Sequence, residues 1–193
     1  MAWIERVLKT HKPSDKEASI YGVLLFTDTH AHVKKVVYDD DYWRALDEIS
    51  GDLWPIFCTR AEPGTYVMPS PPPGILAMMV PVWEEPRANK ELLEAFELEN
   101  TEKLPCLIVF AREQHGSYLK NVMTIKGSTE QEAFNSMSAH IQTVSDALKE
   151  ISPKNLRNPL GVHSATSLAI THAEDWELIK NGVKLWQWFK SIK

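Results

Sequence analysis

The sequence contains few of the residues from which the commonest catalytic and redox motifs are built. Two of its 193 residues are cysteines, Cys58 and Cys106, and they form neither a C-x-x-C pair nor a zinc ligand set. Its eight glycines include no P-loop and no G-x-G-x-x-G, and the chain also lacks G-x-S-x-G and H-E-x-x-H. We therefore expect no bound cofactor.

Positive charge is also scarce, and long apolar runs are absent. The net charge is −5 at pH 7, and the densest basic cluster is Lys34 with Lys35, so no nucleic-acid partner is expected. No segment approaches the roughly 20 apolar residues that span a bilayer, and residues 1–17 lack the apolar core of a secretory signal. These absences favour a reduced, cytoplasmic protein that does not bind membranes.

What the sequence does contain is ordinary for a globular protein, with 44% hydrophobic and 24% charged residues. Short continuous apolar runs predict buried strands. They lie at 21–26, 53–59, 75–83 and 104–111, with further strands expected at 36–38 and 118–125. Apolar residues spaced three and four apart predict helices, over 2–10, 39–51, 90–98 and 134–151. Strands and helices alternate along the chain, which predicts an α/β fold.

Caps and breakers set the expected limits of these elements. Asp39–Asp41 offers an N-cap to one helix and Gly51 is placed to end it. Ser128 predicts a capping box at the start of the last long helix. Residues 61–74 are rich in proline and glycine and are expected to form a loop, and residues 154–164 are expected to form a connector.

The stretch FELENTEKLPCLIVFA resembles the segment of thioredoxins in which a short helix leads into a strand opened by a cis-proline. The preceding AMMVPVWEEPRANKELLEAF and the following YLKNVMTIKG, with the long helix after it, are similar to neighbouring thioredoxin elements. The resemblance implies that Pro105 is the cis-proline. It also implies a thioredoxin-like three-layer sandwich over 20–151, with a mixed central sheet of about five strands and helical extensions over 1–19 and 152–193.

The chain departs from the thioredoxin pattern at the redox motif. Thioredoxins carry C-x-x-C at the start of the helix that follows the strand corresponding to 53–59. Here the proline-rich loop 61–74 occupies that position and contains no cysteine. A helix N-terminus lowers the pKa of a thiol placed there, and this chain supplies no such thiol. The resemblance therefore implies a redox-inactive scaffold, and we expect a non-catalytic protein-binding or regulatory module.

A second hypothesis keeps thiol chemistry and assigns it to Cys58 and Cys106. The resemblance implies that their strands are antiparallel neighbours at the centre of the sheet, with Cys58 near the end of one strand and Cys106 near the start of the other. The two thiols would then lie close together and form an atypical redox pair. Against this, neither cysteine has an activating neighbour in sequence, and buried cysteines are commonly inert.

A third hypothesis concerns D-T-H-A-H, which resembles the metal-binding strand of amidohydrolases. On a strand, His30 and His32 would point to one face, and Asp28 would add a carboxylate to a metal-dependent hydrolase site. That superfamily builds its site on a (β/α)₈ barrel of about 250 residues, which is longer than this chain. We therefore interpret the motif as a polar turn after a strand and expect no metal.

The last twenty residues are unusually aromatic. Trp176, Trp186 and Trp188 lie in a stretch whose apolar residues would cover most of a helix surface. Such a helix packs either on its own domain or on a partner, and tryptophan is favoured at the centres of interfaces. We expect a protein partner or self-association, and we predict that these tryptophans and Tyr66 of the proline-rich loop bind it.

Overall fold

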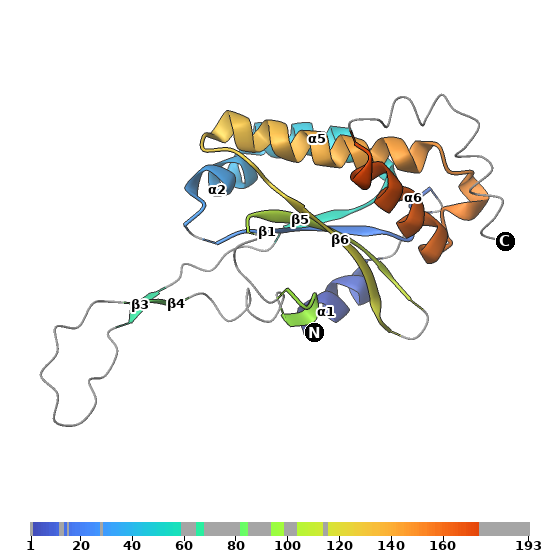
Figure 1. Cartoon of the computed structure of the whole chain (residues 1–193), viewed down its shortest axis with the longest axis horizontal. Helices are drawn as coiled ribbons and strands as arrows, with labels where there is room; N and C mark the ends of the chain where they lie inside the picture. Colours follow the sequence, from blue (N-terminus) through green and yellow to red (C-terminus); the bar gives the residue numbers. More distant parts are fainter. Residues whose placement is uncertain are drawn as a thin grey trace, which may run out of the picture.

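The structure is a computed structural model that describes residues 2–11, 14, 16–27, 29–58, 65–67, 82–84, 94–98, 104–113 and 116–173. Within these residues the chain forms a mixed α/β fold (Figure 1). The helices are α1 (Ala2–Thr10), α2 (Ala31–Tyr38), α3 (Asp40–Ser50), α5 (Glu130–Lys149) and α6 (Pro159–Thr171). The strands are β1 (Tyr21–Leu25), β2 (Ile56–Cys58), β3 (Thr65–Val67), β4 (Val82–Glu84), β5 (Cys106–Arg112) and β6 (Tyr118–Thr124). Short 3₁₀ turns occupy Gly51–Leu53 and Pro153–Asn155.

Four strands form the main sheet in the order β2-β1-β5-β6. β1 pairs in parallel with β2, whereas β5 is antiparallel to both β1 and β6. A separate antiparallel pair consists of β3, from the proline-rich loop, and β4, from the end of the expected run at 75–83. Figure 1 shows this pair at one end of the molecule, apart from the main sheet. The main sheet therefore has four strands in the described part of the chain, against about five expected.

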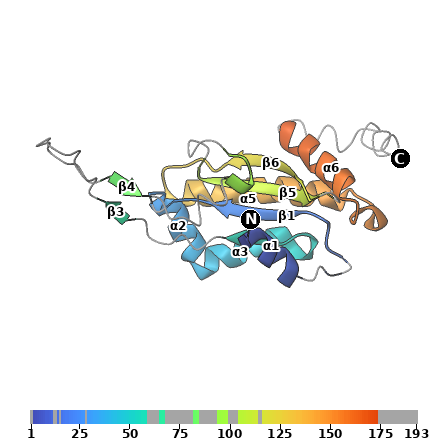
Figure 2. The same cartoon turned by 90° about the horizontal axis from the view of Figure 1, so that it is seen from below.

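The sheet is covered by helices on both faces because its central strands are apolar on both sides. Leu24 of β1 and Leu107 of β5 belong to a core shared with α2, α3, α5 and α6. Leu25 of β1 and Ile108 of β5 point to the opposite core, which Ile4 of α1 joins. Figure 1 shows α5 and α1 on opposite sides of the sheet, and Figure 2 shows α6 on the β6 side.

Three local expectations are wrong. Residues 36–38 do not form a strand but end α2, because Val33 and Val36 pack into the core one helical turn apart. Thr129, and not Ser128, caps α5 by accepting a hydrogen bond from the backbone N–H of Glu132. The expected connector over 154–164 contains the start of α6, with Asn158 as its N-cap.

The two expected extensions contribute to the same cores as the central segment. Leu156 and Val162, from the segment 152–193, are buried in the core that contains α5. On the other face, Glu5 of α1 forms an ion pair with Arg112 of β5 at 3.2 Å. The expected domain boundaries stay predictions.

Trp54 connects the sheet to α5. Its indole is 1% exposed, and its Nε1 donates a hydrogen bond to Ser145 Oγ at 3.0 Å. The ring lies against Gly22 of β1, where an added Cβ would come within 2.7 Å of Trp54 Cζ3. Glycine at this position therefore makes room for the indole, and the serine satisfies its only polar atom.

We expect Ser145→Ala to lower the free energy of unfolding by about 1–3 kcal/mol, because it leaves the buried indole N–H unsatisfied. Ser138→Ala is the matched control on the same helix, since Ser138 Oγ is buried without a hydrogen-bond partner among the described residues. The control should be neutral or stabilising. Urea unfolding followed by circular dichroism measures both changes, and equal effects would contradict a role for the Trp54 hydrogen bond.

Hydrogen bonds between polar side chains join α6 to β6. Asn121 Nδ2 donates a hydrogen bond to Ser167 Oγ at 2.8 Å and lies 3.3 Å from His163 Nε2, which therefore acts as an acceptor. Burial lowers the pKa of His163 below its usual value, against the opposing effects of a hydrogen bond to the Lys120 backbone and the Glu113 charge. The folded state thus favours the neutral imidazole.

Because this folded-state pKa lies below that of the unfolded chain, His163 should reduce stability as the pH falls below about 6.5. The loss should level off below the folded-state pKa. Unfolding free energies of the wild type and His163→Gln between pH 7.5 and 5 test this, and the variant should show the smaller decrease. An identical pH dependence in both proteins would contradict it.

Candidate functional site

Four of the predicted site residues lie outside the described residues: Asp28, Trp176, Trp186 and Trp188. Tyr66 lies in β3, where its backbone is opposite Trp83 of β4. The binding roles of these residues stay predictions.

The expectation that Cys58 and Cys106 lie on neighbouring strands is wrong. β1 separates them, since Leu24 is opposite Cys58 and Leu25 is opposite Cys106. Two strand spacings amount to about 9–10 Å, beyond the roughly 7 Å Cα separation that a disulfide can span. The two side chains also face opposite cores, Cys58 the one with α5 and Cys106 the one with α1. This arrangement does not support a redox pair.

Burial makes each thiol a poor nucleophile. Desolvation raises the pKa of Cys58 to about 12, and Cys106 is 0% exposed. The described helix that begins after a parallel strand is α2, and its first residues Ala31, His32 and Val33 include no cysteine. Among the described helices, none therefore places a cysteine at its N-terminus, the position that lowers a thiol pKa.

The Leu104–Pro105 peptide bond is cis, in agreement with the prediction for Pro105. Pro105 is buried at the start of β5, and its carbonyl accepts a hydrogen bond from the Ile125 backbone N–H at 2.8 Å.

The described part of D-T-H-A-H is a turn and a helix start instead of a strand. His30 occupies the N-cap position of α2, and His32 lies in its first turn. The backbone N–H of Thr27 donates to His30 Nδ1 at 3.1 Å, and Thr27 Oγ1 lies 2.8 Å from the same nitrogen. That nitrogen's lone pair is thus engaged within the turn. The polar-turn interpretation agrees with the structure at Thr29 and His30, whereas Ala31 and His32 already belong to α2.

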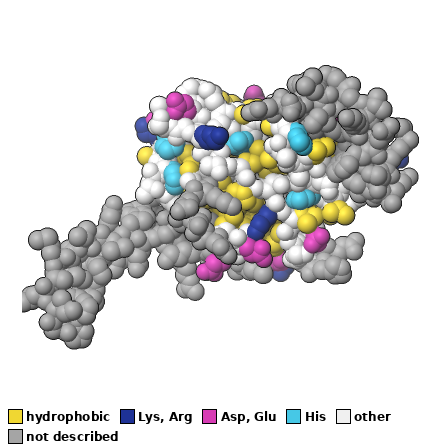
Figure 3. Space-filling model, viewed as in Figure 1, with side chains coloured by type: hydrophobic (Ala, Val, Ile, Leu, Met, Phe, Trp, Pro, Cys, Tyr) yellow, Lys and Arg dark blue, Asp and Glu magenta, His cyan; other side chains and the backbone are white. Residues whose placement is uncertain are grey.

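Among the described residues, no three or more histidine, cysteine, aspartate or glutamate side chains lie together in a group that could hold a metal ion. Figure 3 shows lysine and arginine side chains scattered singly over the face that it presents. Among the described helices, none has the length and apolar character needed to cross a membrane.

Two adjoining hollows lie between β2 and α3, and we call them together the edge groove. The inner hollow, of about 210 Å³, and the outer hollow, of about 460 Å³, share Trp43 and Ile56 in their lining. The outer hollow also contains Tyr38, which is 49% exposed, and Cys58. Among the described strands, β2 pairs only with β1, so the groove lies beside the last strand of the described sheet.

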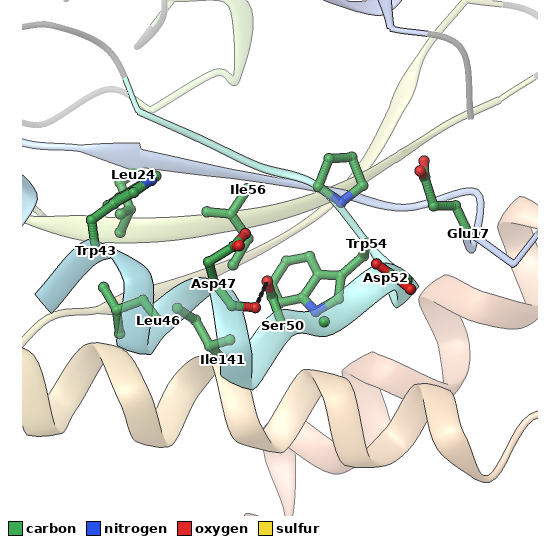
Figure 4. A pocket seen from close by; sticks show the side chains of 12 residues that line it. Glu17, Leu24, Trp43, Leu46, Asp47, Ser50, Asp52, Trp54, Ile56 and Ile141 are labelled. Carbon is green, nitrogen blue, oxygen red and sulfur yellow. Dashed lines mark hydrogen bonds between the residues drawn. The ribbon is translucent and has the colours of Figure 1, made fainter. Parts of the chain in front are cut away.

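The inner hollow has an apolar floor and an acidic rim. Its floor is formed by side chains of the main core, with exposures of at most 2%: Leu24, Leu46, Trp54 and Ile141. Glu17, Asp47 and Asp52 stand at its rim. Figure 4 shows Trp43 and Asp47 projecting from α3 toward the strand that carries Ile56. An apolar floor below carboxylates can receive a side chain or ligand that is apolar along its length and cationic at its end.

The C-terminal end of α3 adds to this negative potential. The last turn contains Asp47 and Glu48 and no basic residue, and Asp52 lies in the 3₁₀ turn that follows the helix. Helix C-termini carry partial negative charge, so acidic residues there are unfavourable by about 0.3–1 kcal/mol each. This acidic pattern is visible in the sequence and is the signal that could have pointed to the groove.

A comparison with protein-family models, with curated proteins and with solved structures finds no match to this chain.

Alkylation by iodoacetamide, mapped by mass spectrometry, tests the properties of the thiols. A pKa of about 12 for Cys58, against an ordinary 9.0, implies a thiolate fraction at neutral pH about a thousandfold lower than that of an ordinary thiol. The alkylation rate of Cys58 should rise tenfold per pH unit from pH 7 to 10. A plateau near pH 9, or a Cys58–Cys106 disulfide after mild oxidation, would contradict this picture.

Proposed function

We propose that this protein is a non-catalytic binding or regulatory module on a redox-inactive thioredoxin-like scaffold, and that it binds a protein partner. The observation that carries the proposal is the edge groove. Apolar and aromatic side chains line its two hollows, and hollows of this kind on a protein surface receive side chains of other proteins.

The exposed aromatic residue of the groove favours a protein partner. Tyr38 is 49% exposed and lines the outer hollow together with Trp43. Tyrosine and tryptophan are enriched among the residues that dominate binding energy at interfaces. The described residues contain only one other large hydrophobic side chain with comparable exposure, Leu160 at 53%, and it does not line the groove.

The order of elements supports the thioredoxin-like assignment. A buried central strand is followed by helices and a parallel strand, and the chain then forms the hairpin β5–β6 and the long helix α5. The positions of Cys58 and Cys106 on opposite faces support the redox-inactive part of the proposal.

The proposal predicts a partner whose binding depends on the edge groove. The tagged full-length chain captures proteins from cells that make it, and each identified candidate is then purified and titrated by calorimetry. Tyr38→Ala should weaken binding by tenfold or more, the size expected of an aromatic interface residue, whereas Leu160→Ala should not. A chain ending at Ala173, which keeps every described element, tests the predicted tryptophans of the tail.

Each result has a defined meaning for the proposal. If Tyr38→Ala weakens the affinity for the partner, the result supports binding at the groove. If truncation at Ala173 abolishes binding of the partner, the result supports binding by the tail. Failure to find any partner that binds the purified full-length chain would contradict the proposal.

A further inference from the structure

The side of α6 that faces away from the core carries no charge, which is unusual for a helix at the surface. The whole helix contains no lysine, arginine, aspartate or glutamate. Val162, Ala165 and Ala169 are buried on the side that packs on α5, β5 and β6, whereas Leu160 is 53% exposed. Figure 2 shows α6 at the margin of the described elements, beside β6. Because helices that are apolar on every side are normally buried, a further segment is expected to cover α6.

Four residues form one stripe along this outward side, and we call them the outer stripe: Leu160, Ser164, Leu168 and Thr171. Residues three or four positions apart lie above one another on one side of a helix. Leu160 and Thr171 are exposed, and Ser164 and Leu168 are half-buried. Two leucines thus flank one small side chain, a shape into which the side chains of a second helix can interlock.

The sequence that follows α6 has a matching apolar pattern. α6 ends at Thr171, and the tail, residues 174–193, begins two residues after His172. The tail lies outside the described residues. In its sequence, apolar residues recur at intervals of three and four: Trp176, Ile179, Val183 and Trp186. This spacing predicts a helix with one apolar stripe of the same length as the outer stripe.

The charges of the tail also favour a helix, although a weak one. Asp175 and Glu177 stand near its start, and Lys190 and Lys193 stand at its end, which is the order that the helix dipole favours. Gly182 lowers the helix propensity in the middle, and isolated helices of this length are marginal in water. A tail helix would therefore need a surface on which to pack.

A hairpin of two antiparallel helices brings the two stripes into register. Helices in such hairpins are joined by about two to five residues, and four residues separate Thr171 from Trp176. Positions then pair in opposite order along the two helices. The facing pairs are Thr171 with Trp176, Leu168 with Ile179, Ser164 with Val183, and Leu160 with Trp186. The smallest residue of the outer stripe thus faces the smallest apolar residue of the tail stripe apart from glycine.

We propose that residues 176–192 fold back on α6 as the second helix of such a hairpin and cover the outer stripe. A segment joined to α6 by four residues is present at an effective concentration on the order of millimolar, which favours it over a second copy or a separate protein. Trp176 and Trp186 then face α6. The docking is independent of the proposed function, but its consequence rests on that function: a partner that binds these tryptophans has to displace the tail from α6.

Disulfide formation in the full-length protein tests the docking. Ser164→Cys/Val183→Cys places two thiols at facing positions of the hairpin. Ser164→Cys/Lys184→Cys is the matched control, because the second thiol moves by one residue and turns about 100° around the tail helix, away from α6. In a glutathione buffer the facing pair should oxidise at least about tenfold faster than the control pair, since a disulfide needs close and correctly oriented Cβ atoms. Peptide mass spectrometry identifies the joined cysteines.

Two results would overturn the docking. Equal oxidation rates of the two cysteine pairs would show that the tail is not held on α6 in this orientation. A disulfide that joins two chains, and whose yield rises with protein concentration, would assign the outer stripe to a second copy. Both variants share Ser164→Cys, which changes one half-buried atom of the fold, and circular dichroism of the reduced proteins verifies that both are folded.

The captured partner separates the docking from the proposed function. A partner that truncation at Ala173 abolishes should bind the oxidised Ser164→Cys/Val183→Cys protein at least about tenfold more weakly than the same protein after reduction, because the disulfide holds the tail on α6. Equal binding of both forms would overturn the masking of the tail tryptophans and leave protein binding established. A selective disulfide without any partner would reject the proposed function and leave the docking established.

Discussion

The indole of Trp54 joins the parts of the molecule on which the rest of the structure depends. It occupies the space that Gly22 leaves on β1, and its nitrogen donates a hydrogen bond to Ser145 of α5, the long helix that packs on the same face of the sheet. Trp54 also directly precedes Pro55 and β2, so its burial holds the edge strand in register beside β1. The position of α3 follows from this, because the 3₁₀ turn between α3 and Trp54 allows little freedom. One buried side chain thus sets both walls of the edge groove.

Elements with a strong and uniform pattern could be predicted from the sequence. The apolar runs of β1 and β5 are buried on both faces, and the regular spacing of α5 places its apolar residues in one core. The prediction of a strand at 36–38 was wrong because Val-Val-Tyr has the local preference of a strand. The packing of Val33 and Val36 on the sheet overrides this preference. The helix α6 was not predicted because its apolar residues do not form one stripe, and the sequence therefore lacks the helical period there.

The candidate site could be predicted much less well, for topological reasons. The distance between Cys58 and Cys106 depends on which strand lies between them, and local sequence does not contain the strand order. The edge groove likewise combines Glu17, the α3 segment and Ile141, which are far apart in the chain and meet only in the folded protein. Only the acidic last turn of α3 carries a local signal, and it is readable because it opposes the helix dipole.

The same buried residues serve the core and the groove, and this has a consequence for binding. Leu24, Trp54 and Ile141 are held by packing on the far side of the hollow, so its floor is ordered before any ligand arrives. Binding then costs mainly the ordering of the partner segment and the desolvation of the rim. Asp47 in the last turn of α3 opposes the helix dipole, and it contributes nothing favourable to the helix there. A rigid apolar floor below an acidic rim is therefore in place before any binding, at some expense of helix stability.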